Sequence, residues 1–169
     1  ERLVSAAVAT GADSFGRDII NAHADTLDIR GYKVEEFAYT IDSMQTYYDV
    51  SMALVSGKYR ELFKPELPIY TKVRDDMPAI YGTKSKAANS LIADGCIIKG
   101  TVENSILFRG VRVGKGVKLK NCVILQDTVV EDNAQLKCVI ADKDAVISEN
   151  CFLVGSERLP IIVPKGETV

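Results

Sequence analysis

Few side chains in this sequence are suited to catalysis, and they are scattered along the chain. His23 is the single histidine, and it lies in a segment of helical character outside the repeats described below. A lone histidine of this kind is more often structural than catalytic. We therefore expect no catalytic residue in this chain.

Four cysteines fall in the second half of the chain without forming a Cys-x-x-Cys pair: Cys96, Cys122, Cys138 and Cys151. A zinc site is therefore not expected. Free cysteine is commonly a small buried hydrophobe, and we assign that role to all four. Cys122 and Cys138 are placed at equivalent points of successive repeats, where their Cα atoms would lie about 5 Å apart and within disulfide range. We nevertheless expect thiols.

A group of basic side chains surrounds a proline-rich segment and is a candidate site for a phosphorylated effector. Its members are Lys72, Arg74, Lys84 and Lys86. Clustered lysines are more commonly just solvated, so both interpretations remain open.

Charge and hydropathy restrict the partners. The 169 residues carry 21 basic and 23 acidic side chains, a formal net charge of −2. Binding along a nucleic acid needs a net basic stripe, so we expect no nucleic-acid partner. No stretch approaches the roughly 20 apolar residues of a membrane-spanning helix, and residues 1–5 lack the shape of a signal peptide. We expect a cytoplasmic protein with no membrane partner.

Self-similarity in the second half of the sequence determines the fold class. Residues 104–114 match residues 121–131 at an offset of 17, and residues 127–133 match residues 144–150 at the same offset. Apolar residues recur about every six positions, a period of neither an α-helix nor an alternating strand. Such a repeat describes a triangular coil of three short strands with Gly, Asp or Asn at its corners. We predict a mainly β fold, with a parallel β-helix of about four coils over residues 84–158.

One branched side chain from each strand should point inward and stack on its counterpart in the next coil, about 4.8 Å away. Val113, Val130 and Ile147 are predicted to form one such ladder. An antiparallel sandwich is the alternative, but the turns as a set do not follow the Asn-Gly or Asp-Gly pattern of two-residue hairpins. The predicted core contains Ile98, Leu107, Val113, Leu119, Ile124, Val130, Leu136, Ile147 and Leu153.

The residues before the repeat show no six-residue period and instead carry the signals of short helices and strands. Ser14 or Asp13 is predicted to cap a short helix, and two β-like runs flank Gly31. Ser43 is predicted to cap a helix from Met44 to about residue 56. We interpret residues 1–60 as the end of an α/β domain whose main sheet is absent.

Two further segments, one on each side of the predicted β-helix, contain prolines. Residues 61–83 are predicted to form an extended proline-rich connector. Residues 159–169 are predicted to form a tail in which the β-branched run 161–163 lies as a capping strand over the last coil or against a neighbouring subunit.

The order of several motifs resembles one known family over essentially all 169 residues. The motifs are Ile41-Asp42-Ser43, Tyr47-Tyr48, Leu67-Pro68-Ile69-Tyr70-Thr71, Pro78-Ala79-Ile80-Tyr81-Gly82 and the run 89–107. They are similar to the carboxy-terminal portion of ADP-glucose pyrophosphorylases, also called glucose-1-phosphate adenylyltransferases. The resemblance implies a nucleotidyltransferase domain, here truncated to its α/β tail, followed by a left-handed parallel β-helix of the hexapeptide-repeat type.

For catalytic members, the resemblance implies adenylyl transfer from ATP to glucose 1-phosphate with Mg²⁺, in glycogen biosynthesis. Their Gly-rich nucleotide loop has no counterpart here. Phe37 stands where they carry a metal-binding aspartate, and a phenyl ring offers Mg²⁺ no oxygen ligand. Glu35 and Glu36 are adjacent carboxylates, but a neighbouring residue on a strand faces the opposite side. The resemblance therefore points to the non-catalytic GlgD type of subunit, with no metal or cofactor on this chain.

The expected role is regulatory or structural, in subunit assembly and in interdomain, allosteric contacts. Unpaired strand edges at the coil ends would be covered by a catalytic sister subunit or by another copy of the chain. One alternative is a hexapeptide-repeat acyltransferase, which shares the coil but places a catalytic histidine between coils. The other alternative is a free-standing sugar-phosphate effector-binding module built on the basic group around the connector.

Overall fold

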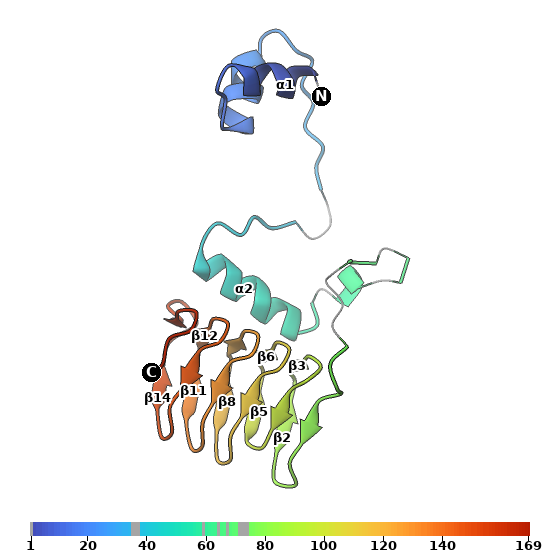
Figure 1. The fold of residues 1–169 in the computed structure, drawn as a ribbon. Helices are drawn as coiled ribbons and strands as arrows, with labels where there is room; N and C mark the ends of the chain where they lie inside the picture. The colour runs from blue at the N-terminus through green and yellow to red at the C-terminus, as the bar shows by residue number, and fades with distance from the viewer. Residues whose placement is uncertain (1, 35–37, 59, 64, 67, 71–74) are drawn as a thin grey trace. The chain divides into compact units, whose positions relative to one another are not determined.

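The computed structural model describes residues 2–34, 38–58, 60–63, 65–66, 68–70 and 75–169 (Figure 1). The chain forms two compact units, residues 1–38 and residues 39–169.

The first unit contains three short helices: α1 (Arg2–Ala9), the π-helix η1 (Phe15–Ile20) and the 3₁₀-helix η2 (Asn21–His23). The predicted cap at Ser14 is confirmed, since its hydroxyl accepts a hydrogen bond from the Arg17 amide at 3.3 Å. A ring nitrogen of His23 lies 2.9 Å from the carbonyl oxygen of Ile19, in the preceding turn. The described residues 28–34 form no strand, in contrast to the predicted β-like run, because isolated strands without a full sheet are marginal.

The second unit begins with helix α2 (Met44–Val55), whose cap is the predicted one. The Ser43 hydroxyl accepts a hydrogen bond from the Thr46 amide at 3.1 Å, and Gly57 follows the helix with a φ of 77°. A positive φ is the usual conformation of a glycine that terminates a helix. A single 3₁₀ turn, η3 (Arg60–Phe63), follows.

Three five-stranded parallel sheets form the β-helix. Sheet A contains β1 (Ile80–Tyr81), β4 (Ile97–Ile98), β7 (Arg112–Val113), β10 (Val129–Val130) and β13 (Val146–Ile147). Sheet B contains β2 (Lys86–Ala88), β5 (Thr101–Glu103), β8 (Lys118–Lys120), β11 (Gln135–Lys137) and β14 (Phe152–Val154). Sheet C contains β3 (Leu91–Ile92), β6 (Ile106–Leu107), β9 (Val123–Ile124), β12 (Val139–Ala141) and β15 (Ile161–Val163).

The predicted β-helix of about four coils is confirmed, and its strands extend to both sides of the predicted range 84–158. Val130 pairs in register with Val113 on one side and with Ile147 on the other, as the ladder requires. Eight of the nine predicted core residues are at most 2% exposed. Leu153 is only partly buried because it lies in β14, at the edge of its sheet.

A column of left-handed residues turns the corner between sheets B and C. Asn89, Asn104, Asn121 and Cys138 have φ values of 43°, 48°, 53° and 52°. Asparagine tolerates this conformation better than most residues. The amide of Asn89 donates to the side-chain oxygen of Asn104 at 2.8 Å, and Asn104 donates to that of Asn121 at 2.7 Å. Cys138 ends this asparagine ladder.

The predicted equivalence of Cys122 and Cys138 is wrong by one residue. Ile140 pairs with Val123, so Cys138 lies beside Asn121, and Cys122 lies beside Val139. All four cysteines are free thiols. Burial raises the pKa of Cys122 to about 12, and its sulfur donates to the carbonyl oxygen of Lys120 at 3.2 Å.

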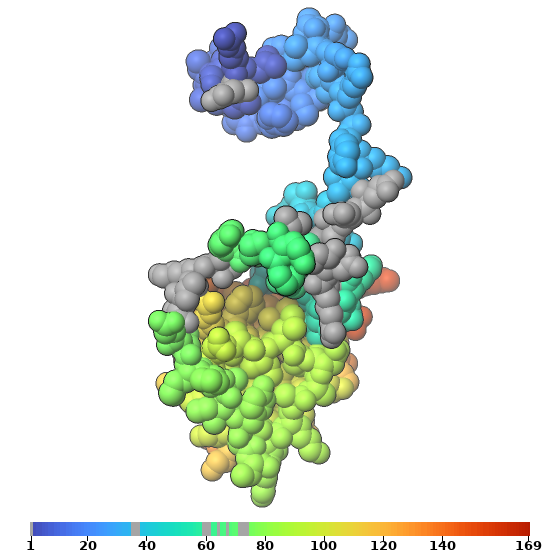
Figure 2. Space-filling model, turned by 90° about the vertical axis from the view of Figure 1, so that its right-hand side faces the viewer, coloured from blue at the N-terminus to red at the C-terminus, as the bar shows by residue number. Residues whose placement is uncertain are grey.

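The tail continues the stack at its carboxy-terminal end. Strand β15 pairs with β12, and Val163 is 2% exposed. Beyond it, the Val146 amide donates to the carbonyl oxygen of Glu167 at 2.8 Å. The first coil is less covered, since Tyr81, which pairs with the buried Ile98, is 52% exposed. The end of the stack formed by the first coils, in green, faces the viewer in Figure 2.

Candidate functional site

Helix α2 lies on the outer face of sheet C and belongs to the same unit as the β-helix (Figure 1). The helix falls within residues 1–60, the predicted end of an α/β domain, whereas the structure divides the chain after residue 38. The physical reason is an apolar contact, in which Tyr48 packs with Val123, Cys138 and Ile140. Helix α2 thus covers outward-facing apolar side chains of sheet C and forms a second apolar layer outside the core of the β-helix.

Tyr48 anchors the helix to the corner of a coil. Its side chain is 1% exposed, and its hydroxyl donates a 2.8 Å hydrogen bond to the carbonyl oxygen of Asn121. Burial raises the pKa of Tyr48 far above the ordinary value of a phenol. At neutral pH the phenol is therefore protonated and available as a donor.

Glu157 forms polar contacts with both the first turn of α2 and the asparagine ladder. The side-chain amide of Gln45 donates to the carbonyl oxygen of Glu157 at 2.8 Å. The amide of Asn121 donates to the Glu157 carboxylate at 3.5 Å, which extends the asparagine ladder by one polar contact. Helix and β-helix are thus joined by both apolar and polar contacts.

An open groove of about 860 Å³ runs beside the first turn of α2. Its walls are mostly apolar, and Ile41, Met44 and Ile162 are 57%, 44% and 45% exposed. The remaining lining residues are Asp42, Ser43, Tyr47, Leu125, Ile140, Asp142, Lys143, Pro164 and Lys165. An exposed apolar surface of this kind is typical of a place where another segment packs.

Two lysines stand one above the other at the rim of this groove. Ala141 pairs with Val163, so Lys143 and Lys165 occupy equivalent positions of adjacent coils, and the Gly166 amide donates to the carbonyl oxygen of Lys143 at 2.9 Å. Equivalent Cα atoms of stacked strands lie about 4.8 Å apart. The two ammonium groups therefore present positive charge at one corner of the stack.

The aspartates that line the groove are engaged within the chain. The carboxylate of Asp142 accepts from the Lys143 amide at 2.7 Å, and that of Asp42 accepts from the Thr46 hydroxyl at 3.1 Å. Among the described residues, no carboxylate forms an ion pair with Lys143 or Lys165. Both ammonium groups are exposed and available to an anion.

The two described members of the predicted effector group, Lys84 and Lys86, do not line the groove beside α2. Lys72 and Arg74 lie outside the described residues. Lys84 is exposed in a turn, and Lys86 is exposed in β2. Sequence reasoning missed Lys143 and Lys165, although each follows a β-branched strand of the same sheet. Extending the repeat alignment into the tail would have paired them.

The residues predicted to mark lost catalysis, Phe37 with Glu35 and Glu36, also lie outside the described residues. Across the described ranges, no three His, Cys, Asp or Glu side chains gather as ligands of a metal ion. No described helix has the length and apolarity needed to cross a membrane.

The stacked coils define a class of protein, the hexapeptide-repeat β-helices. Residues 76–158 match the family model described as GlmU-like, C-terminal hexapeptide. Relatives extend the similarity beyond the coils. The chain is 42% identical over 151 residues to the glycogen biosynthesis protein GlgD of Bacillus subtilis, a match that covers 89% of this chain and 44% of the relative.

Two further relatives also match a larger share of this chain than of their own length. The glycogen biosynthesis protein GlgD of Geobacillus stearothermophilus is 42% identical over 108 residues, covering 64% of this chain and 32% of the relative. The glucose-1-phosphate adenylyltransferase of Acetivibrio thermocellus is 31% identical over 153 residues, covering 88% of this chain and 35% of the relative. The chain thus spans less than half the length of these relatives. Over most of its length it is similar to part of the GlgD proteins and glucose-1-phosphate adenylyltransferases.

Proposed function

We propose that this chain is the part of a glycogen-biosynthesis subunit that serves assembly and interdomain contacts, and that it does not itself transfer adenylyl groups. The observation that supports this role is the docking of α2 on sheet C through the buried Tyr48. The helix joins the β-helix to everything that precedes it in the chain.

The apolar groove beside α2 provides the interdomain surface in this proposal. Ile41 and Met44 come from the start of the helix, and Ile162 comes from the last strand of sheet C. These side chains are exposed in the unit 39–169. Burying them against a further domain would gain roughly 25 cal/mol for each square ångström of apolar surface removed from water.

The partner in this proposal is a catalytic sister subunit, a second copy of the chain, or both. The test mixes the chain with the glucose-1-phosphate adenylyltransferase of the same organism and measures the mass of the mixture by light scattering. We expect a complex with the wild-type chain. A chain carrying Tyr48→Ala, in which the helix loses its anchor, should bind less tightly, and the exposed Lys118→Ala serves as the control. Two separate monomeric peaks at micromolar concentrations would refute the assembly role.

A regulatory function is the second candidate, and the stacked pair Lys143 and Lys165 favours it. Two unpaired ammonium groups beside an apolar wall suit a phosphorylated small molecule whose carbon skeleton packs against the groove. The predicted group of Lys72, Arg74, Lys84 and Lys86 is a separate candidate site for the same class of effector. Sugar phosphates would be the effector class.

Calorimetric titration with fructose 1,6-bisphosphate and with inorganic phosphate tests this candidate. The double substitution of Lys143 and Lys165 by alanine should abolish the heat of binding. The matched control replaces Lys118 and Lys137, two exposed lysines of sheet B, by alanine. If the control loses as much affinity as the groove variant, general charge attraction accounts for the binding.

A further inference from the structure

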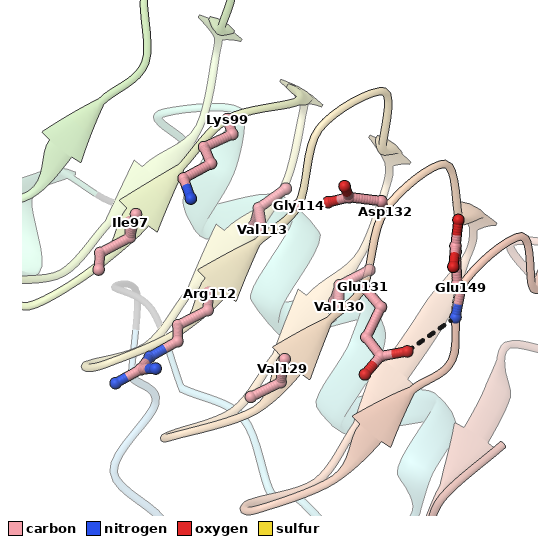
Figure 3. Close-up of a pocket in the computed structure, with 10 residues that line it drawn as sticks. All are labelled: Ile97, Lys99, Arg112, Val113, Gly114, Val129, Val130, Glu131, Asp132 and Glu149. Atoms are coloured by element: carbon pink, nitrogen blue, oxygen red, sulfur yellow. Dashed lines mark hydrogen bonds between the residues drawn. The ribbon is translucent and has the colours of Figure 1, made fainter.

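The outer face of sheet A holds a second groove, distinct from the one beside α2 (Figure 3). Its volume is about 480 Å³, and its lining comes from the successive strands β4, β7 and β10, the corners that follow them, and Glu149 in the corner after β13. Gly114 is one of the lining residues. A Cβ at this position would lie 2.8 Å from the amide nitrogen of Asp132, so the close approach of the next coil requires glycine.

Charges of opposite sign occupy opposite halves of this groove. Lys99 and Arg112 belong to the earlier coils, whereas Glu131, Asp132 and Glu149 belong to the later coils (Figure 3). All five side chains are exposed. The face is therefore positive toward the first coil and negative toward the last.

The two halves do not neutralise each other within one chain. Glu131 accepts a hydrogen bond from the Glu149 amide at 3.0 Å, and Asp132 accepts one from the Lys115 amide at 2.7 Å. No ion pair joins Lys99 or Arg112 to a carboxylate in the described part of the chain. Both cations remain available to an external carboxylate.

A row of outward apolar side chains accompanies the charges. Ile97, Val129 and Val146 occupy equivalent positions on their strands, with Arg112 in the same register between Ile97 and Val129. The three apolar side chains are half-buried, and Ile80, at the start of the row, is 49% exposed. The face thus combines an apolar row, interrupted by Arg112, with charged side chains at the corners that follow the strands, and protein interfaces likewise combine apolar and polar parts.

The geometry points to a second copy of this chain as the occupant of sheet A's outer face. A pattern that is positive at one end and negative at the other is complementary to itself when it is reversed. A two-fold axis in the plane of the face, between β7 and β10, performs that reversal and makes an isologous contact. Strand β7 then lies opposite the partner's β10, and β4 lies opposite the partner's β13.

This arrangement brings both cations of each copy toward carboxylates of the other. Arg112 of one copy faces the strand that carries Glu131 in the other, and Lys99 faces the coil that carries Glu149. Ile97 packs opposite Val146 in the apolar strip. A parallel arrangement would instead place like charges together and would be repulsive. The inference deepens the proposed assembly role and rests on it for its biological purpose, but it assigns one particular face and one particular partner.

Charge reversal tests the pairing in the full 169-residue chain. Sedimentation equilibrium should show a dimer whose dissociation constant rises with ionic strength, because salt screens exposed charges. Arg112→Glu and Glu131→Arg should each weaken the dimer at least about tenfold, since each substitution acts twice in a symmetric interface. The double variant, with both charges exchanged, should recover most of the wild-type affinity. Lys118→Glu, an equal charge change on sheet B, should leave the dimer unaffected.

Circular dichroism melting of every variant separates loss of association from loss of folding. A wild-type chain that stays monomeric at high micromolar concentration, or that associates only with a catalytic adenylyltransferase, would overturn the inference. So would a double variant that binds no better than the single variants. The assembly role proposed above would survive these results if the chain still formed a complex with the adenylyltransferase.

Discussion

The phenol oxygen of Tyr48 and the carbonyl oxygen of Asn121 lie 2.8 Å apart, and their hydrogen bond joins helix α2 to a corner of the β-helix. Tyr48→Phe removes this bond but keeps the ring, and we expect it to lower the free energy of unfolding by about 0.5–1.5 kcal/mol. Tyr48→Ala also leaves a cavity, and we expect a loss of about 3–5 kcal/mol. Urea denaturation measures both losses. Equal losses for the two variants would contradict the packing described here.

The same tyrosine makes stability depend on pH in the alkaline range. Burial raises the pKa of Tyr48 above its ordinary value of 10.0, so the folded chain keeps a proton that the unfolded chain releases. This contribution to stability is fully present below pH 10 and falls as the pH rises above about 10. Melting temperatures at about pH 8 and about pH 11 should differ more for the wild-type chain than for Tyr48→Phe. Identical pH dependence in the two chains would show that the phenol is not protected from water.

The inward ladder of sheet A is sensitive to charge. Val130 is 1% exposed between Val113 and Ile147, so Val130→Asp places an unpaired carboxylate in the core. We expect this chain to be unfolded in the coils at 25 °C, because an isolated buried charge costs far more than the roughly 5–15 kcal/mol by which domains are stable. Gln135→Asp, at an exposed position of β11, is the control and should melt near the wild-type temperature. Far-ultraviolet circular dichroism measures both.

The repeat made this ladder predictable, because the period of about six positions is imposed by the geometry of the coil itself. Val113, Val130 and Ile147 are 17 residues apart in sequence and neighbours in the sheet. The same offset of 17 aligns Cys138 with Asn121. Comparing Cys138 with Cys122 instead matched residue type and ignored the corner conformation, which is why the predicted equivalence was wrong.

No repeat or motif in the sequence predicts that α2 packs on sheet C. Its capping by Ser43 is local and was predictable, but the contact between Tyr48 and Asn121 spans 73 residues. From the sequence alone, only its place in the chain indicates a domain for this helix, and that place indicates the preceding one. The candidate lysines were missed for a similar reason, since Lys143 and Lys165 become neighbours only when the tail is laid on the last coil.

The tail should contribute to stability. Truncation after Arg158 removes β15 together with Val163, which packs on the core cluster. It also removes the acceptor for the Asp142 amide, which donates to the Val163 carbonyl oxygen at 2.9 Å. We expect a lower melting temperature or, if the bared edge of β12 pairs with another chain, a larger mass in light scattering. Truncation after Lys165, which keeps β15, is the matched comparison. If the chain truncated after Arg158 has the melting temperature and mass of the wild type, β15 does not cover the edge of β12.

Pyrophosphate release from ATP and glucose 1-phosphate in the presence of Mg²⁺ is the most direct test of the proposed non-catalytic role. We predict no release above background from the pure chain at any Mg²⁺ concentration. A longer form that includes the preceding domain should also be inactive, and Phe37→Asp should restore activity only in part, because a single carboxylate does not rebuild a metal site. Sustained, Mg²⁺-dependent pyrophosphate release by the pure chain would contradict the account.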